Sequence, residues 1–186
     1  MPLLKSASTK KSVRSVKRIT RSTAMVMYRK QLSRFHKNKA GNNVIITQRN
    51  VVIGTDDTWF NAQEIDRNPA WVQVPNARYV WSSRDLGAEV AVVSKQFTLS
   101  SRRRVRNASL LLSVDNYAIV LINGRFVVYD TPQATVSFFN PGRIFDVRRF
   151  LRRGQNDIVI IAFNFGGRRT IDNPAGVAAR LSIRQS

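Results

Sequence analysis

Lysine and arginine are the residues whose number and placement in this sequence point most directly to a chemistry. The first 55 positions contain no aspartate or glutamate, and Asp56 is the first carboxylate. Residues 1–43 therefore contribute about +12 of the formal net charge of +20. A segment of this composition attracts phosphate groups and cannot bury enough apolar surface to fold alone, so we expect it to need a partner. Its twelve cations are Lys5, Lys10, Lys11, Arg14, Lys17, Arg18, Arg21, Arg29, Lys30, Arg34, Lys37 and Lys39.

Three arginine clusters follow in the rest of the chain, each in or beside an expected turn. They could converge on one end of the folded domain and extend the positive field of the N-terminal arm, or they could be independent charges on solvated loops. The sequence has no zinc-finger spacing, helix-turn-helix pattern or RNA-recognition aromatic motif, so any nucleic-acid contact should be made to phosphates and should not depend on base sequence. The clusters are Arg102–Arg104 with Arg106, Arg148-Arg149 with Arg152-Arg153, and Arg168-Arg169.

Tryptophan and aspartate offer two further chemistries. Trp59, Trp71 and Trp81 are the candidate platform for stacking a sugar ring, although a sandwich of this size usually buries its large aromatics in the core. Asp56 and Asp57 could supply hard oxygen ligands to Ca²⁺, or they could be solvated acids in a turn. We predict no bound metal and no cofactor.

The residue types needed for catalysis are scarce. His36 is the only histidine, it lies in the basic arm, and the chain has no cysteine. A Ser/His/Asp triad, a histidine metal cluster and thiol chemistry are therefore excluded within one chain. The segment Gly166–Arg169 lacks the Lys-Ser/Thr ending of a phosphate-binding loop. We predict that the protein is not an enzyme.

The arm contains one segment with helical periodicity, Ser22–Phe35. Its apolar stripe consists of Met25, Tyr28, Leu32 and Phe35, at spacings of three and four residues. The helix could lie on a phosphate backbone, on an anionic membrane surface, in a groove of a neighbouring protein, or on the core of its own domain. Residues 38–43 have the composition of a linker, so we divide the chain into an arm and linker, 1–43, and one domain, 44–186.

From residue 44 onward the pattern changes to short β-rich runs with no amphipathic helix between them. Such a pattern predicts an all-β fold, an antiparallel β-sandwich or jelly roll, preceded here by an extended, partly helical basic arm. The start has no apolar region before a cleavage site, and no run is long enough to span a membrane, so we expect no signal peptide and no transmembrane segment. The expected strands are Val44–Thr47, Val51–Ile53, Val90–Leu99, Ala108–Val114, Ala118–Ile122, Arg125–Tyr129, Ile158–Phe163 and Ala178–Ile183.

The strongest local signal is Asn123-Gly124 between the runs Ala118–Ile122 and Arg125–Tyr129. This dipeptide tolerates positive φ at both central positions of a type I′ turn. The sequence therefore predicts a tight hairpin at this position.

Several of these pieces, in their order and spacing over residues 57–184, resemble the galactose-binding-like β-sandwich domains that occur as accessory modules of glycosidases. The resemblance implies a sandwich with carbohydrate held on the loops at one end. The matching motifs are those of the scaffold, and no ligand-contacting set is matched residue by residue. The matching pieces are Trp59, Trp71, Ala77–Trp81, Lys95–Leu99, Ala108–Ala118, Asn123-Gly124, Phe145–Ile160 and Asn173–Leu181.

A basic, acid-free arm on a jelly-roll-like domain is also similar in architecture to many viral coat proteins. We therefore expect a non-enzymatic virion structural protein, a minor capsid or cement-type subunit located in the virion. Its partners would be other capsid subunits or copies of itself, with nucleic acid bound through phosphates. The alternatives are a carbohydrate-binding or lectin-like attachment protein, and a sequence-independent nucleic-acid-binding protein outside virions.

Overall fold

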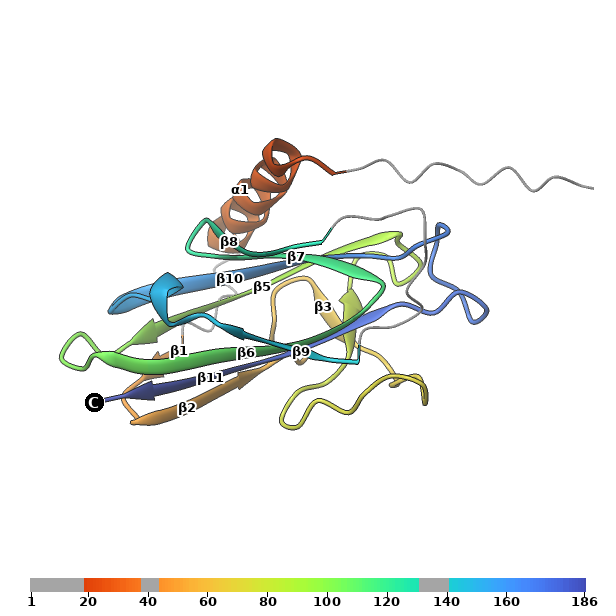
Figure 1. The fold of residues 1–186 in the computed structure, drawn as a ribbon. Coiled ribbons are helices and arrows are strands. Elements are labelled where there is room, and N and C mark those ends of the chain that lie inside the picture. Colours follow the sequence, from red (N-terminus) through yellow and green to blue (C-terminus); the bar gives the residue numbers. More distant parts are fainter. Residues whose placement is uncertain (1–18, 38–43, 131–140) are drawn as a thin grey trace, which may run out of the picture.

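A computed structural model describes residues 19–37, 44–130 and 141–186 of the 186-residue chain (Figure 1). The fold is a β-sandwich of two stacked sheets with one α-helix on the outer face of one sheet (Figure 1). The expected all-β sandwich is confirmed. The linker expected at 38–43 lies outside the described residues.

Two sheets of mainly antiparallel strands form the sandwich. The one parallel pair within the described residues joins β1 to β5. The first sheet consists of β1 (Val44–Ile46), β5 (Val90–Leu99), β10 (Gly154–Phe163), β7 (Tyr117–Ile122) and β8 (Arg125–Tyr129), in spatial order. The second sheet consists of β3 (Ala62–Glu64), β4 (Val80–Ser82), β11 (Gly176–Gln185), β6 (Val105–Asp115) and β9 (Arg143–Asp146), and β2 (Asn50–Gly54) also pairs with β11.

The expected strands are all present, and several are longer than expected because pairing continues past the apolar run. In β10, for example, the ladder with β5 begins at Gly154, four residues before the apolar run Ile158–Phe163. Three strands were not expected from the sequence, namely β3, β4 and β9. They have only three or four residues each, too few for an alternating pattern to stand out.

The predicted hairpin is confirmed between β7 and β8. Asn123 has φ 50° and Gly124 has φ 73°, as a type I′ turn requires. The Asn123 side chain also ties the turn to the neighbouring strand. Its Oδ1 accepts a hydrogen bond from the backbone N–H of Asp157, and its Nδ2 donates to the Oδ1 of Asn156.

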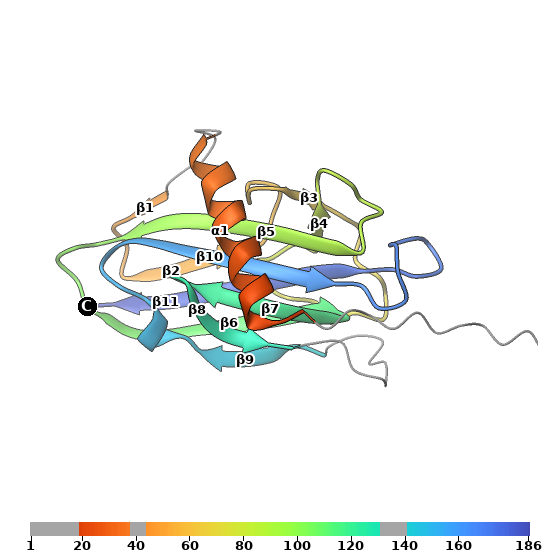
Figure 2. The ribbon, with the colours of Figure 1, turned by 90° about the horizontal axis from the view of Figure 1, so that it is seen from above.

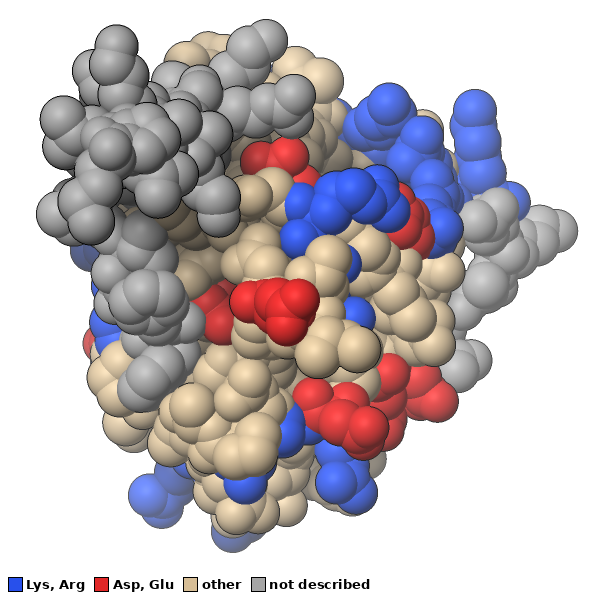
Figure 3. Space-filling view, turned by 90° about the vertical axis from the view of Figure 1, so that its right-hand side faces the viewer, with Lys and Arg blue, Asp and Glu red and all other residues tan. Residues whose placement is uncertain are grey.

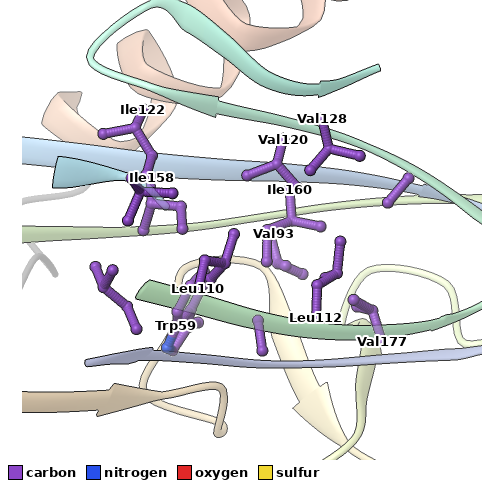
Figure 4. Close-up of a cluster of buried hydrophobic side chains, with 14 of the residues drawn as sticks. Trp59, Val93, Leu110, Leu112, Val120, Ile122, Val128, Ile158, Ile160 and Val177 are labelled. Carbon is purple, nitrogen blue, oxygen red and sulfur yellow. The ribbon is translucent and has the colours of Figure 1, made fainter. Parts of the chain in front are cut away.

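The main core lies between the two sheets and is filled by aliphatic side chains and one tryptophan (Figure 4). Alternate residues of β10 contribute to it: Ile158 and Ile160 point inward, among Val93, Leu110 and the other side chains labelled in Figure 4. The residues between them, such as Val159 and Ile161, are also fully buried, although they face away from the second sheet. The first sheet is therefore apolar on both faces.

The helix α1 (Arg21–Lys37) covers this outer apolar face and crosses β5, β10 and β7 (Figure 2). Thr20 caps its start, because its hydroxyl accepts a hydrogen bond from the backbone N–H of Thr23. Three basic residues, Arg34, His36 and Lys37, occupy the last turn, where positive charge complements the helix dipole.

Polar contacts fix the position of α1 on the sheet. The Tyr28 hydroxyl donates to the Oδ1 of Asp157 over 2.7 Å. The buried Gln31 amide donates to the carbonyl oxygen of Val92 over 3.0 Å and to the Ser94 hydroxyl over 3.2 Å. Burial raises the pKa of Asp157, and the hydrogen bond from Tyr28 opposes that rise.

The apolar stripe expected in the arm therefore contacts the chain's own sheet. Tyr28 and Phe35 are buried, and Met25 and Leu32 are half-buried against the outer cluster of the sheet. Of the alternatives left open by the sequence, the structure supports packing on the chain's own domain, and the stripe is not available to a neighbouring protein. The division of the chain at residues 43 and 44 stays a prediction, and the packing of α1 is a physical reason to expect that residues 44–186 are insufficient.

Removal of α1 tests this division. A chain truncated to residues 44–186 should lose about 5 kcal/mol or more of unfolding free energy, because several outer side chains worth about 1.5–3 kcal/mol each become exposed. Denaturant unfolding and binding of an apolar dye would measure the effect. A chain truncated to residues 19–186 keeps α1 and is the control. Equal stability of the two truncated chains would show that the sandwich does not need the helix.

A second prediction concerns the turn. Gly124→Val should destabilise the protein by about 1 kcal/mol or more, because a β-branched residue is strained at a φ of 73°. Gly124→Asn is the control, since asparagine tolerates positive φ. Thermal unfolding measures both variants, and similar melting temperatures for Val and Asn would contradict the turn requirement.

Candidate anion-binding site

The long strands run from one end of the sandwich to the other, so the connecting loops are grouped at two ends. The two groups of loops differ in their charged residues. Leu99 pairs with Gly154, and Ile122 pairs with Ile158, so the connections that follow β5 and β7 and precede β10 lie at the same end. We call this the arginine end and define it as residues 100–104, 123–124 and 147–153. The opposite end, which we call the carboxylate end, is formed by residues 55–61, 65–79, 83–89 and 164–175.

Two of the three arginine clusters meet at the arginine end. They line one cavity of about 470 Å³. The cavity contains five arginines and a single carboxylate, that of Asp146, so its lining is strongly positive. The lining residues are Arg104, Val105, Asp146, Arg148, Arg149, Leu151, Arg152 and Arg153.

A single 3₁₀ turn, η1 (Arg148–Phe150), positions the first group of guanidinium groups. Phe150 is buried, and the guanidinium groups of Arg125 and Arg149 lie 4.8 and 5.0 Å from the centre of its ring. Arg125 also donates to the backbone oxygen of Arg149 over 2.7 Å. The Oδ1 of Asp146 accepts from the backbone N–H of Arg148, so the one carboxylate is partly engaged by the turn itself.

A buried asparagine positions the second group. Asn156 is fully buried, and its side chain accepts from the backbone N–H of Arg152 and donates to the carbonyl oxygens of Arg152 and Gly154, over 2.7 to 2.9 Å. The Nε of Arg152 donates to the carbonyl oxygen of Gln155 over 2.8 Å. These bonds fix the conformation of the loop that carries Arg152.

No cavity arginine forms a direct ion pair with a carboxylate in the described part of the chain, although the charge of Arg152 opposes the rise in the pKa of Asp157. The two ion pairs found there join Arg143 to Asp130 and Arg168 to Asp85, and neither belongs to the cavity. Guanidinium groups present planar donors that match the oxygens of phosphate. The arrangement can therefore bind an anion with several phosphate groups.

The third cluster lies elsewhere. Arg168 and Arg169 are in the β10–β11 connection at the carboxylate end, where Arg168 pairs with Asp85 at 3.0 Å and Arg169 donates to the carbonyl oxygen of Ala175. The convergence of the clusters is thus found for two of them and is wrong for the third. The direction of β10 is the reason, because it carries the chain from one end of the sandwich to the other.

The cations of the arm fall into two sets. Arg29, Lys30 and Lys37 are exposed on the outer side of α1, and Arg34 is half-exposed. Arg21 lies 5.2 and 5.1 Å from the ring centres of Phe126 and Tyr129. The remaining candidates, Lys5, Lys10, Lys11, Arg14, Lys17, Arg18 and Lys39, lie outside the described residues.

The tryptophans do not form a sugar-stacking platform. Trp59, Trp71 and Trp81 are 2%, 4% and 0% exposed, respectively. Their indole N–H groups donate to the carbonyl oxygen of Gly54, the Oδ2 of Asp115 and the carbonyl oxygen of Ala88. The expectation of a carbohydrate site on these three residues is therefore wrong, because the large rings fill the interior instead.

The two adjacent acids expected as calcium ligands belong to a turn. The Oδ1 of Asp56 accepts from the backbone N–H of Thr58 over 2.9 Å and from the Thr58 hydroxyl. Asp57 is exposed. In residues 19–37, 44–130 and 141–186, no three His, Asp or Glu side chains gather closely enough to hold a metal ion. The same residues contain no helix of the length and apolarity needed to cross a membrane.

The carboxylate end holds a larger cleft of about 1030 Å³. Its lining carries both charges. Figure 3 shows this end of the molecule, with acidic groups in red and basic groups in blue. The charged lining residues are Asp56, Glu64, Asp66, Arg67, Arg78 and Arg169.

One buried carboxylate, that of Asp115, lies near this end. It is 4% exposed, its Oδ2 accepts from the Trp71 indole, and its Oδ1 has no hydrogen-bond partner among the residues that the structure describes. Burial raises the pKa of Asp115 to about 6, and the hydrogen bond from Trp71 opposes the rise. Asp115 is therefore a buried carboxylate whose pKa lies above that of an exposed aspartate.

Comparison with known proteins gives no family assignment. No protein-family model matches the chain, and no curated protein matches it. Solved structures with a similar arrangement include an α-L-rhamnosidase from Dictyoglumus thermophilum, with 15% identity and a TM-score of 0.41 over 71% of this chain and 16% of that one. A β-glucuronidase from Bifidobacterium dentium has 14% identity and a TM-score of 0.35 over 77% of this chain and 32% of that one.

A cycloisomaltooligosaccharide glucanotransferase from Paenibacillus has 12% identity and a TM-score of 0.35, over 86% of this chain and 22% of that one. The chain thus spans less than a third of the length of each of these proteins. The assignment as a β-sandwich rests on the strand pairing of the chain itself.

Asp115 generates a pH prediction. Between about pH 4 and pH 6 the unfolded chain has lost this proton while the folded chain keeps it, so the free energy of unfolding should fall as pH rises through this window, by up to about 3 kcal/mol. Asp115→Asn should flatten the profile in this window. Denaturant unfolding at several pH values measures it, with Asp172→Asn, which removes an exposed carboxylate, as the control. An unchanged slope in Asp115→Asn would contradict the assignment.

Proposed function

We propose that this protein is a non-enzymatic structural subunit that binds nucleic-acid phosphates at its arginine end, without regard to base sequence. The observation that carries the proposal is the cavity in which five arginines, from two segments far apart in the sequence, surround a single carboxylate. Electrostatic attraction to phosphates supplies most of such binding.

The positions of the cations support a sequence-independent mode. Two of the cavity arginines are held in place: Arg149 lies over the Phe150 ring, and Arg152 donates to the carbonyl oxygen of Gln155, so their charges have fixed positions. The helix α1 packs its apolar face on the sheet and presents Arg29 and Lys30 to solvent, which suits contact with a phosphate backbone. Base edges are read by elements inserted into a groove, and neither the cavity nor α1 is built as such an element.

We place this activity in a virion, where the sandwich would pack in the shell and its cations would meet the genome or neighbouring subunits. The support is architectural, namely a strongly basic N-terminal segment attached to a β-sandwich. Purified particles would then contain the protein in a fixed ratio to their other subunits. Its absence from particles, together with retained nucleic-acid binding, would favour the alternative of a nucleic-acid-binding protein outside virions.

The proposal that the protein is not an enzyme is supported by the surroundings of its titratable groups. His36 is exposed and packs edge-on against Phe35 at 6.1 Å between ring centres. The buried carboxylates of Asp115 and Asp157 are hydrogen-bonded to Trp71 and Tyr28. These arrangements hold the structure together and pair no base with a nucleophile.

Carbohydrate binding remains the second candidate, at a different place from the tryptophans. The cleft at the carboxylate end is large and lined by planar polar groups that can bind hydroxyl groups, including those of Arg78 and Glu64. This candidate predicts glycan binding that Arg78→Ala weakens and that salt leaves almost unchanged. Absence of binding across a glycan array would exclude it.

The phosphate-binding proposal is tested by salt dependence. Arg148→Ala with Arg153→Ala should weaken binding to duplex DNA and lower the slope of log K against log salt by about 2, since each phosphate contact contributes about 0.9. The double variant Arg78→Ala with Arg84→Ala removes equal charge at the other end and should keep more of the slope. Equal losses in both double variants would contradict a site at the arginine end, and discrimination between two unrelated duplexes would contradict the sequence-independent mode.

A further inference from the structure

Charge is segregated along the long axis of the sandwich. Exposed or half-exposed carboxylates gather in and beside the connections of the carboxylate end, whereas the arginine end has Asp146 alone. Figure 3 views the carboxylate end, where red groups are spread over the face. The carboxylates of this end are Asp56, Asp57, Glu64, Asp66, Asp85, Glu89, Asp130 and Asp172.

The carboxylates of this end are poorly neutralised by the arginines beside them. The Nη1 of Arg67 donates to backbone carbonyl oxygens, among them that of Trp71, and the Nε of Arg169 donates to the carbonyl oxygen of Ala175. Within residues 19–37, 44–130 and 141–186, the ion pairs at or beside this end join Arg168 to Asp85 and Arg143 to Asp130. Glu64 and Asp66 are exposed and line the cleft, and neither residue takes part in these ion pairs.

A single molecule cannot bring its two ends together. The strand β5 has ten residues, so the ends are about 33 Å apart at a rise of about 3.3 Å per residue. This separation is several times the screening length of about 8 Å at physiological salt. The complementary charges can therefore meet only between molecules.

We propose that the carboxylate end of one molecule binds the arginine end of a second copy, in a head-to-tail contact. The cleft lined by Glu64 and Asp66 receives the arginines of η1 and of the loop that follows it. The net positive charges of the two copies lie farther apart than the contacting pairs, so moderate salt already screens their repulsion, whereas high salt also weakens the exposed pairs in contact. Because the two surfaces differ, the contact is heterologous and builds a ring or an open chain of subunits.

The proposal shares the arginine end with the proposed function but does not depend on nucleic acid. Phosphates and the carboxylates of a neighbour would occupy the same guanidinium groups, so each arginine end binds one or the other. Nucleic acid should therefore shorten the assemblies. An experiment without nucleic acid separates the two proposals, because self-association can be present whether or not the protein binds DNA.

The test uses the full chain, freed of nucleic acid by nuclease treatment, in sedimentation-velocity measurements over a range of concentrations at about 50 and 500 mM salt. The unaltered protein should associate reversibly at low salt and dissociate at high salt. The variants Glu64→Lys with Asp66→Lys and Arg148→Glu with Arg153→Glu should each lose at least tenfold in association constant. An equimolar mixture of the two variants should associate again, because the exchanged charges complement one another.

The control is Arg29→Glu with Lys30→Glu, a charge reversal of equal size on the solvent side of α1, which should leave association in place. All substituted residues are exposed, and circular dichroism confirms that the variants are folded. A protein that stays monomeric at low salt would overturn the proposal. So would association that both charge-reversed variants retain, or two inactive variants that fail to associate when mixed.

Discussion

The structure depends on the need to cover a β-sheet that is apolar on both sides. Every residue of β7 is buried, and alternate residues of β7 and β10 face away from the partner sheet. A sandwich of two sheets covers one face of this layer and leaves Ile119, Leu121 and Val159 on the other. The helix α1 supplies the third layer, and this requirement places a strongly basic helix on the outside of the domain with its charged side toward solvent.

The third layer and the arginine end are connected through the start of β10. Asp157 accepts the hydrogen bond from Tyr28 of α1, and its neighbour Asn156 holds the loop that carries Arg152. Asn123 of the hairpin joins both residues, since it bonds to the backbone of Asp157 and to the side chain of Asn156. The adjacent residues Asn156 and Asp157 thus hold two different parts of the molecule: Asp157 holds the helix, and Asn156 holds the loop that carries Arg152. A shift of the helix on the sheet would therefore be passed to this loop through the start of β10.

Much of the fold could be predicted from the sequence, because its signals are local. Asn123-Gly124 required positive φ, and the apolar runs at Ala118–Ile122 and Ile158–Phe163 required strands. The same runs also indicated that another element must pack on the outer face of the sheet, since an uninterrupted apolar strand is buried on both faces. Read together with the stripe of Tyr28, Leu32 and Phe35, they could have favoured packing of the helix on its own domain over packing on a neighbour.

The candidate site was less predictable, because it depends on which end of the sandwich each loop reaches. The arginine clusters look alike in the sequence, but one long strand, β10, lies between Arg148 and Arg168 and puts them at opposite ends. Four strands, β6 to β9, lie between Arg104 and Arg153, and this even number returns the chain to the same end. The burial of Trp59, Trp71 and Trp81 could not be decided locally either, since stacking on a ligand and stacking in a core use the same ring. The short strands β3, β4 and β9 form through pairing with distant partners and not through their own pattern.

The order of the layers along the chain has a consequence for biosynthesis. α1 leaves the ribosome before the strands that it covers, and the sheet face on which it packs is complete only when β10 has been made. At about 5–20 residues per second, the helix waits on the order of ten seconds for the last residues that it will cover. Throughout that interval its apolar stripe is exposed, and the absence of any acid in its neighbourhood makes nascent copies repel one another. The charge around the stripe is therefore expected to oppose aggregation of the unfinished chain.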